Sequence, residues 1–390
     1  MKHVLFIFGG LLAVNQSATA GINRLLNLIK ASQLAGAKVS VLALTENDKL
    51  TSFDEKGVSY ILLPIHPYRN KKPLKKLTAF FQLGVDLTLQ AEKMWNTYPF
   101  DVVCCYGGHL RVAYPLLKLR QKTHIAIVMN EWWNSSGGGI SRKIDIELGR
   151  KYIYPQFESI ISASTSLVNK FPMIKNKILI PAVYDEEEFL VDGLPIDCEN
   201  INIAYAGNIG LRKDYTDMVV VALALLPPDI KNKFRLHLIG VKKQELLQYI
   251  NNPEDVNQEQ IIYYDYMSKR RLYKFLKTMD FTILIRPNSN YHNDGFANKF
   301  GESMMLGVPV IATLTSDMAN YFQDGEQGFV VEEASPDAVA KTFLRIADNV
   351  DKEHIRVMGE NAKTMAKKSF TLECAASQIK FFLDSIKVAN

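Results

Sequence analysis

Two acidic residues in the stretch 294-DGFANKFGESMMLGVPVIAT-313 could bind a ligand that carries several hydroxyl groups. Asp294 lies in a loop-like Asp-Gly segment, and Glu302 follows eight residues later, about one turn into an expected helix. Carboxylates accept hydrogen bonds from paired hydroxyls such as those of a ribose or hexose ring. Gly295 would let the backbone approach a ligand closely. The alternative is structural, because Glu302 could instead pair with Lys299 at i to i+3 spacing on the helix surface.

A second stretch, 203-IAYAGNIGLRKDYTDMVVVALALL-226, has residues suited to a phosphate group. An expected strand ends at Ala206, Gly207 turns the chain, and Arg212 and Lys213 precede an expected helix. The N-terminus of a helix carries free N–H groups and a partial positive charge, so it attracts phosphate. Two adjacent cations would add to that attraction for a diphosphate. The alternative is a basic loop that faces water.

Further candidates follow two expected strands of the first half. His109 lies between a strand and a helix in 106-YGGHLRVAY-114, and Glu131 begins a loop with Trp132 and Trp133 in 129-MNEWWNSSGGG-139. Glu131 could bind or orient a hydroxyl group for attack, and the tryptophans could stack on a sugar ring or touch lipid. Alternatively, the tryptophans fill a corner of the core. The glycines at 137–139 are typical of a mobile lid that excludes water.

Several familiar motifs are absent from the sequence. It contains neither G-x-x-x-x-G-K-[ST] nor G-x-G-x-x-G, which excludes a P-loop and removes the main support for dinucleotide binding. No Asp-x-Asp occurs, so we expect a metal-free mechanism and no bound cofactor. The four cysteines have neither the number nor the spacing of a disulfide framework or a metal site, and they fit a reducing cytoplasm. The formal net charge of +5 is modest, and we expect no nucleic-acid partner.

The elements that would position these residues alternate between strand and helix in both halves of the 390-residue chain. Apolar runs such as 101-DVVCCY-106 and 124-HIAIVM-129 are typical of parallel strands covered on both faces. The expected strands lie near 2–8, 38–44, 59–63, 101–106, 124–129, 159–163, 201–206, 234–240, 261–265, 280–285, 308–312 and 328–331. The expected helices lie near 21–35, 110–121, 142–154, 215–226, 242–250, 268–278, 298–306, 316–323, 336–348, 352–369 and 373–387. This order predicts an α/β protein with two doubly wound, parallel-sheet, Rossmann-like domains facing a central cleft.

The expected domain boundaries follow from composition. We predict an N-terminal domain over 1–190, a linker over 191–200, a C-terminal domain over 201–370, and a helix over 371–390 that could cross back to the first domain. The stretch 181-PAVYDEEEFLVDGLPIDCEN-200 has two prolines, many acids and little periodicity, which favours a linker.

The start, 1-MKHVLFIFGGLLAV-14, resembles a signal peptide. We favour a buried strand followed by a turn at Gly9 and Gly10, because the next helix would complete a β-loop-α unit. The sequence contains no run of about 18 apolar residues, so we expect no transmembrane helix.

Positive charge gathers in 68-YRNKKPLKKLTAFF-81, which has five basic residues, no acid and flanking aromatics. Such a stretch could lie on an anionic membrane surface. An equally suitable interpretation is that the stretch forms a loop and a helix face that are exposed to solvent.

Taken together, these blocks resemble a retaining glycosyltransferase of the GT-B fold, of the family-four type. The pattern of two acids separated by seven residues, followed by G-x-P-V-I-A, is similar to 294-DGFANKFGESMMLGVPVIAT-313, which also contains the K-F-x-E variant of enzymes that build bacterial surface polysaccharides. The family block G-R-L-x-x-x-K-G is similar to 207-GNIGLRKD-214. Looser similarity covers 20-AGINRLLNLIKASQLAGAKVSVLAL-44, 178-ILIPAVYDEEEF-189 and 319-ANYFQDGEQGFVVEEASPDAVAKTF-343.

The resemblance implies roles for individual residues. Lys213 would bind the diphosphate of a nucleotide-sugar donor, Glu302 the ribose hydroxyls, and Asp294 the donor sugar. With Glu131, these are the expected catalytic residues, and His109, Glu131 and Trp132 are the expected acceptor contacts. The further expected donor contacts are Gly9, Gly10, Gly207, Asn208, Arg212, Arg286, Gly295, Phe296, Ala297 and Lys299.

Two residues depart from the family pattern. Asn208 stands where the family has a diphosphate-binding arginine, and either Arg212 or Arg286 could replace that charge. Asp294 is one methylene shorter than the family's glutamate. The resemblance implies transfer of a sugar, with retention, to a cell-envelope glycan or lipid-linked acceptor, by a cytoplasmic protein that could attach to the inner face of the membrane. A sugar-nucleotide epimerase of the same architecture and a non-catalytic sugar-binding protein are the alternatives.

Overall fold

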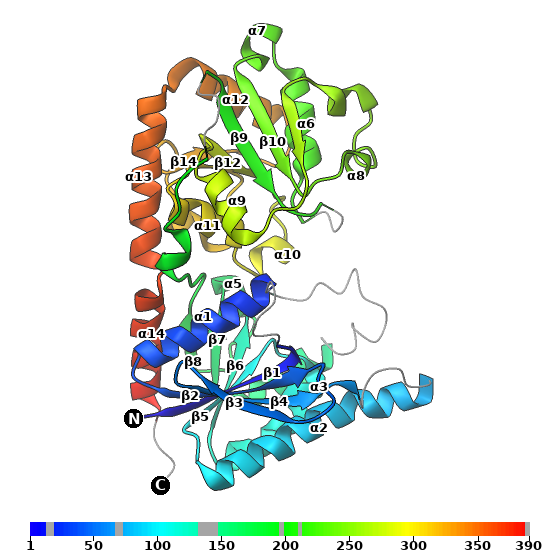
Figure 1. Cartoon of the computed structure of the whole chain (residues 1–390), viewed down its shortest axis with the longest axis vertical. Helices are drawn as coiled ribbons and strands as arrows, with labels where there is room; N and C mark the ends of the chain where they lie inside the picture. Colours follow the sequence, from blue (N-terminus) through cyan, green and yellow to red (C-terminus); the bar gives the residue numbers. More distant parts are fainter. Residues whose placement is uncertain (13–18, 67–72, 132–146, 195–198, 210–212, 387–390) are drawn as a thin grey trace. The chain divides into compact units, whose positions relative to one another are not determined.

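The computed structural model describes residues 1–12, 19–66, 73–131, 147–194, 199–209 and 213–386, with only the backbone described at 73–77 and 80 (Figure 1). The chain forms two compact units. The first comprises Met1–Tyr184 and Leu372–Asn390, and the second comprises Asp185–Thr371. The segment expected to be a linker therefore lies in the second unit, and the C-terminal helix lies in the first. Within the described ranges, no helix is long and apolar enough to cross a membrane.

The first unit is built on an eight-stranded sheet with the order β3-β4-β2-β1-β5-β6-β7-β8. All pairs are parallel except β3 with β4 at one edge. The strands are β1 (His3–Leu11), β2 (Lys38–Thr45), β3 (Thr51–Glu55), β4 (Val58–Pro64), β5 (Val102–Tyr106), β6 (His124–Met129), β7 (Ser159–Ser162) and β8 (Asn176–Leu179). The continuous apolar runs of β5 and β6 are buried, as expected for strands covered on both faces.

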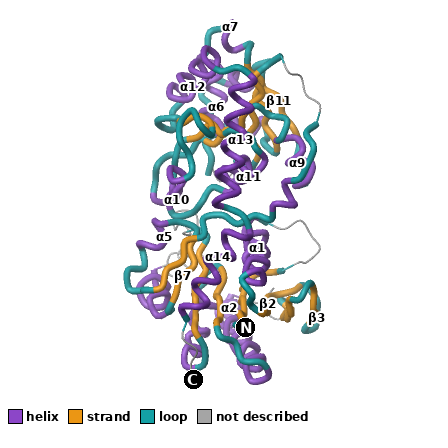
Figure 2. The backbone as a smooth tube through the Cα atoms, turned by 90° about the vertical axis from the view of Figure 1, so that its left-hand side faces the viewer, coloured by secondary structure: helices purple, strands orange, loops and turns teal. Residues whose placement is uncertain are grey.

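Helices cover both faces of this sheet. Helix α1 (Ala20–Leu34) and the C-terminal helix α14 (Leu372–Ser385) pack side by side over one core, as Figure 2 shows. Helices α2 (Pro73–Thr97) and α3 (Leu110–Leu116) cover the other core, and α5 (Thr165–Asn169) follows β7. Burial of Cys104 and Cys105 in β5 raises the pKa of both thiols to about 12, so they act as small apolar core residues.

Several elements of the first unit differ from the sequence-based prediction. Strand β1 continues through Gly9 and Gly10 instead of turning there. A side chain at Gly9 would collide with Val112 of α3, so glycine is needed for close packing, whereas the prediction assumed a turn. Strands β3 and β8 and helix α2 were not predicted, because β3 is largely polar and α2 begins in the basic stretch. The expected helix over 110–121 divides into α3 and a 3-10 helix over Leu117–Gln121.

The second unit has a fully parallel six-stranded sheet with the order β11-β10-β9-β12-β13-β14. The strands are β9 (Ile201–Ala206), β10 (Phe234–Ile239), β11 (Ile261–Tyr264), β12 (Phe281–Leu284), β13 (Val310–Ala312) and β14 (Gly328–Val330). The helices are α6 (Thr216–Leu225), α7 (Pro228–Lys231), α8 (Lys243–Leu246), α9 (Lys269–Leu276), α10 (Asn290–Asn293), α11 (Asn298–Leu306), α12 (Pro336–Asn349) and α13 (Lys352–Ser369). The alternation of strands and helices confirms the predicted α/β class with two parallel-sheet domains.

Candidate active site

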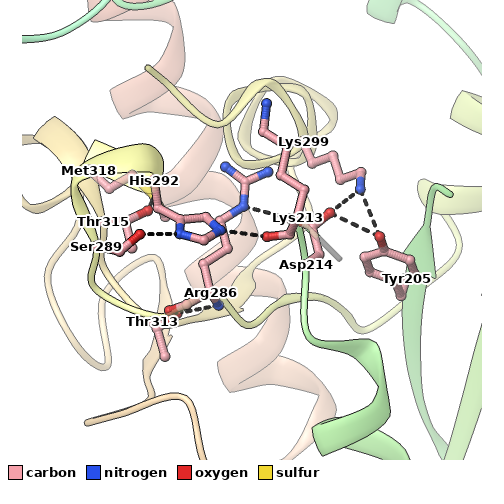
Figure 3. A network of polar contacts seen from close by, with 10 residues as sticks. All are labelled: Tyr205, Lys213, Asp214, Arg286, Ser289, His292, Lys299, Thr313, Thr315 and Met318. Carbon is pink, nitrogen blue, oxygen red and sulfur yellow. Dashed lines mark hydrogen bonds and ion pairs between the residues drawn. The ribbon is translucent and has the colours of Figure 1, made fainter. Parts of the chain in front are cut away.

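Three neighbouring strands of the second unit end at the same edge of the sheet and supply the candidate site. Tyr205 lies near the end of β9, Arg286 follows β12, and Thr313 follows β13. Because β9, β12 and β13 are parallel neighbours, their carboxyl ends meet at one edge, where ligands bind in open α/β sheets. The hydroxyl of Thr313 fixes the backbone of Arg286, since it accepts from the Arg286 N–H at 2.7 Å and donates to the Arg286 carbonyl at 2.7 Å (Figure 3).

Asp214 is the centre of the polar network in Figure 3. Its side chain is only 3% exposed, and Arg286 Nε donates to its Oδ1 at 2.6 Å. Its Oδ2 accepts from the Tyr205 hydroxyl at 2.9 Å and from Lys299 Nζ, which also donates to the Tyr205 hydroxyl at 3.0 Å. One buried carboxylate therefore holds two cations from separate elements, Arg286 after β12 and Lys299 in the first turn of α11.

The electrostatics of this network follow from its burial and its charges. Burial would raise the pKa of Asp214, but Arg286 and Lys299 together hold that pKa well below its usual value. Burial lowers the pKa of Lys299, and the attraction of Asp214 partly offsets this effect. Burial and the neighbouring Asp214 raise the pKa of Tyr205 well above its usual value, so its hydroxyl stays protonated. Lys213, drawn in the same cluster, is a third cation near these strand ends (Figure 3).

Lys213 is held through its backbone. Its carbonyl accepts from His292 Nε2 at 2.9 Å, which fixes the tautomer, so His292 Nδ1 accepts from the Ser289 hydroxyl at 2.8 Å. Burial lowers the pKa of His292, so the neutral imidazole that this arrangement requires is favoured. The Lys213 ammonium lies 5.6 Å from the centroid of the Tyr291 ring, and its side chain is half-buried.

The two acids of the opening motif lie on consecutive short elements. Asp294 ends α10 and is only 1% exposed, whereas Glu302 is the fifth residue of α11 and is half-buried. Burial raises the pKa of Glu302, although Lys269 and the Tyr273 hydroxyl oppose this shift. The hydrogen bonds of the Lys299 ammonium go to Asp214 and Tyr205, so the alternative in which Lys299 pairs with Glu302 on the helix surface does not describe this site.

In the loop between these acids, the side chains of Phe296 and Ala297 pack against neighbouring residues. The Phe296 ring packs against Phe300, Tyr321 and Phe370, with centroids 5.9, 5.9 and 5.4 Å away. Ala297 is the N-cap of α11 and is 2% exposed. In the described structure, the N-cap side chains of α6 and α11 make no capping hydrogen bond, and the first turn of a helix is the end that attracts anions.

The glycine-rich loop is only partly described. A side chain at Gly207 would collide with the end of Lys299, so glycine leaves room for that ammonium next to β9. Asn208 is exposed, and Arg212 lies outside the described residues. Of the two candidates for the missing arginine charge, Arg286 is brought into the network with Lys299, Asp214 and Lys213.

The first-unit candidates lie at the carboxyl ends of β1, β5 and β6. Tyr106 at the end of β5 donates to the Gly21 carbonyl at 2.6 Å and accepts from Asn130 at 2.6 Å, and Arg24 donates to Asn130 Oδ1 at 2.7 Å. Glu131 follows Asn130 directly and is half-buried. His109 is the N-cap of α3, and Arg111 in the first turn of that helix donates to the Gly9 carbonyl at 3.3 Å. Trp132 and the glycines at 137–139 lie outside the described residues.

The sequence-based prediction missed Asp214, Tyr205 and His292 in the second unit, and Arg24 and Asn130 in the first. A signal for Asp214 was available, because this acid directly follows Lys213 in a stretch expected to bind phosphate. In the described part of the chain, no group of three His, Cys, Asp or Glu side chains could hold a metal ion.

Comparison with known proteins shows which proteins the chain resembles. Residues 187–365 match the family described as "Glycosyl transferases group 1". An uncharacterized glycosyltransferase of Methanocaldococcus jannaschii is 22% identical over 186 residues, which cover 46% of this chain and 44% of that protein, so the match spans less than half of this relative.

Solved structures resemble the chain over nearly its whole length. Sucrose-phosphate synthase from Thermosynechococcus elongatus gives a TM-score of 0.72 at 15% identity, with 98% of both chains covered. The UDP-forming α,α-trehalose-phosphate synthase of Burkholderia vietnamiensis gives 0.73 at 10%, with 99% of this chain and 100% of that one covered. Anabaena HepE in complex with UDP-glucose gives 0.66 at 12%, with the same coverage. The chain therefore has the GT-B fold, and residues 187–365 are similar to the glycosyl transferases group 1 family.

Proposed function

We propose that the protein is a glycosyltransferase that moves a sugar, with retention of anomeric configuration, from a nucleotide-diphosphate-sugar to a glycan or lipid-linked acceptor of the cell envelope. The observation that carries this proposal is the convergence of Lys213, Arg286 and Lys299 at the strand ends of a domain that matches glycosyl transferases group 1. The complex of the similarly folded Anabaena HepE with UDP-glucose supports a nucleotide-sugar donor.

The proposed chemistry neutralises charge on the leaving group. When the bond between the anomeric carbon and the diphosphate breaks, its electron pair goes to the diphosphate oxygen, and positive charge develops on the sugar ring. Lys213 and Arg286, with the first N–H groups of α6 and α11, would stabilise the diphosphate without a metal ion. The acceptor hydroxyl would attack from the face of the leaving group and give its proton to the diphosphate. Glu131 and His109 would orient that acceptor in the first unit.

The carboxylates would bind the two sugar rings of the donor. Glu302 would accept hydrogen bonds from the ribose hydroxyls, and Asp294 would contact the transferred sugar. The backbone N–H groups of Gly295 and Ala297 would lie close to sugar or phosphate oxygens. The raised pKa of Glu302 is suited to a group that gains hydrogen-bond donors only when the ligand arrives.

The test is nucleotide release by the full chain with UDP-, GDP- and ADP-sugars, each with and without glycan acceptors. Release that requires both substrates supports transfer, whereas a changed donor sugar without acceptor, seen by proton NMR, would indicate an epimerase. Replacing Glu302 by Gln should lower kcat/KM roughly 10- to 100-fold, because a charged hydrogen-bond acceptor is lost. The matched control is Glu259→Gln, an exposed acid just before β11 at the opposite edge of the same sheet. Turnover by Glu302→Gln within about threefold of wild type would reject the site.

We also propose peripheral attachment to an anionic membrane through 68–81. Residues 68–72 lie outside the described residues and only the backbone is described at 73–77 and 80, so the proposal rests on the five basic residues and flanking aromatics of the sequence. Replacing Lys71, Lys72, Lys75 and Lys76 with Gln should weaken co-sedimentation with vesicles that contain phosphatidylserine. Unchanged sedimentation would remove the idea without affecting the proposed transfer.

A further inference from the structure

A hollow lies in the first unit, at the sheet edge opposite to the strand ends described above. Its volume is about 430 Å³, which is within the usual range for small-molecule sites. It is formed by the amino ends of β1, β2 and β4, the edge strand β3, and the last turns of α2. It is therefore separate from the candidate donor and acceptor residues, all of which lie at carboxyl ends of strands.

The face of the sheet under α2 changes from apolar to polar at this hollow. Side chains alternate between the two faces of a strand, so Leu5 and Ile7 of β1 and Leu42 and Leu44 of β2 share the α2 core. The same alternation places His3 of β1, Ser40 of β2 and Ser59 of β4 on this face. Strand β3 pairs with β4, and this pairing adds Ser52 and Asp54 to the same face. The sequence thus places hydroxyls, an imidazole and a carboxylate where a further apolar layer would otherwise complete the core.

The innermost polar pair is preorganised. His3 and Ser40 are 8% and 4% exposed. The Pro99 carbonyl can only accept, so His3 Nδ1 donates to it at 3.2 Å, and His3 Nε2 then accepts from the Ser40 hydroxyl at 2.9 Å. Burial and the neighbouring Lys38 lower the pKa of His3, which favours this neutral form. The Ser40 proton is therefore committed to His3, and its oxygen is left to accept a hydrogen bond from a ligand hydroxyl.

The outer wall combines charge with aromatic surface. Lys38 Nζ lies 4.8 Å from the centroid of the Tyr98 ring, and Lys93 projects from α2 as an exposed side chain. Asp54 accepts from the Ser59 hydroxyl at 2.5 Å. Two cations against one carboxylate give a net positive lining. Hydroxyl donors and acceptors beside an aromatic ring suit a sugar, and the excess cation suits one that carries a carboxylate.

We propose that this hollow is a second carbohydrate-binding site, which takes a saccharide unit and prefers an acidic one such as a uronic acid. On the proposed function, such a site would hold a growing or finished glycan away from the place of transfer and raise its local concentration. The binding claim itself does not depend on transfer activity.

The experiment uses the full chain and saturation-transfer difference NMR, with glucuronic acid and glucose as probes. Lys93→Glu reverses a charge at the wall, and Ser52→Tyr fills the mouth from an exposed strand position. Lys118→Glu is the matched control, since Lys118 is an exposed lysine outside the hollow and the net charge changes equally. Both hollow variants should weaken glucuronic acid binding roughly tenfold, whereas Lys118→Glu should leave it unchanged. Glucuronic acid should bind more tightly than glucose.

The proposal fails if neither sugar gives a signal, or if both hollow variants bind like wild type. Thermal melting of each variant verifies folding, and a parallel titration with UDP separates this result from the donor site. UDP binding should be the same in Lys93→Glu, Ser52→Tyr and wild type. A wild-type chain that binds glucuronic acid but not UDP would contradict the proposed function and leave this inference standing.

Discussion

At the scale of single residues, Asp214 determines where the cations of the candidate site lie. Arg286 and Lys299 come from different elements, and their charges would repel each other without the carboxylate between them. A buried carboxylate costs free energy by itself, and this one is stabilised because two cations and a tyrosine hydroxyl complete its hydrogen bonds. Asp214 is therefore a positioning residue for the groups proposed to meet the diphosphate.

Replacing Asp214 with Asn should destabilise the protein by roughly 3–5 kcal/mol, because it leaves Arg286 buried without its counter-charge. Thermal and urea denaturation measure this loss, and Asp229→Asn, at an exposed position, is the control. The depressed pKa of Asp214 also implies that its stabilisation is present above the unfolded pKa of about 4 and is lost as pH falls through the folded value. Equal stability of Asp214→Asn and wild type at pH 7 would contradict this role.

His237 should give the second unit an acid-sensitive component. It is 3% exposed and lies 3.0 Å from both Asn202 Oδ1 and the Tyr264 hydroxyl, and burial lowers its pKa to about 4. The unfolded chain, with a pKa near 6.5, binds the proton first, so the free energy of unfolding should fall as pH drops from about 6.5 to 4. The expected loss between pH 7.5 and 5 is about 2 kcal/mol. Proton NMR titration, with His237→Gln to assign the resonance, tests this, and a midpoint near 6.5 would be inconsistent with it.

Part of the site was predictable at this scale and part was not. The positions of Lys213, Asp294 and Glu302 follow from local patterns, because a glycine turn before a helix and acids at helix spacing are visible within a few residues. The contacts of Asp214 join residues 72 and 85 positions apart. They depend on β9 and β12 being neighbours in the sheet, which a single sequence does not reveal.

At the scale of elements, the helix that carries Lys299 and Glu302 is positioned by a close contact with α13. Gly307 ends α11 in the left-handed conformation, with φ of 76° and ψ of 32°. The carbonyl of Gly307 lies against Gly359 in the middle of α13, where a Cβ atom would collide with it. The two glycines therefore let α11 and α13 approach each other closely.

Gly359→Ala should push α13 away from α11 and cost roughly 1–3 kcal/mol, although alanine favours helices. Gly21→Ala in α1 is the matched control, since nothing lies within 4 Å of the added Cβ and the helix should gain stability. Melting temperatures of the two variants should therefore move in opposite directions. An unchanged or higher melting temperature for Gly359→Ala would show that the contact is not tight.

Helix α14 should stabilise the first unit although it follows the second in sequence. Phe382 is 2% exposed and meets the His124 ring edge-on at 6.0 Å, whereas its neighbour Phe381 is 78% exposed. Phe382→Ala should cost roughly 3–5 kcal/mol and Phe381→Ala almost nothing. Hydrogen exchange of β6 should quicken only in Phe382→Ala. Similar exchange in both variants would mean that α14 does not stabilise this sheet.

The elements of the second unit were predicted more fully than those of the first. Its strands are short apolar runs bounded by glycine, proline or charged residues, and α11 was predicted with the observed bounds, 298–306. Helix α2 was not predicted, although Leu83, Leu87 and Ala91 recur at helical spacing and are buried. Its first turn contains Lys75 and Lys76, which give the start of the helix a charge pattern rather than an apolar period.

At the scale of the whole molecule, the GT-B fold provides two sheets, each with candidate residues at the carboxyl ends of its strands. The second unit carries the cations and acids proposed to bind the donor, and the first carries Glu131 and His109, proposed to meet the acceptor. The further site proposed in the first unit lies at the opposite edge of its sheet. Function is thus assigned to strand ends, whereas the buried interiors of both sheets provide stability.

The most direct test of this account is a crystal structure of the protein soaked with the nucleotide sugar that raises its melting temperature most. We predict the diphosphate within hydrogen-bond distance of Lys213 and Arg286, and the ribose hydroxyls on the Glu302 carboxylate. A donor bound away from the ends of β9, β12 and β13, with Glu302 and Lys213 free of ligand contacts, would contradict the account.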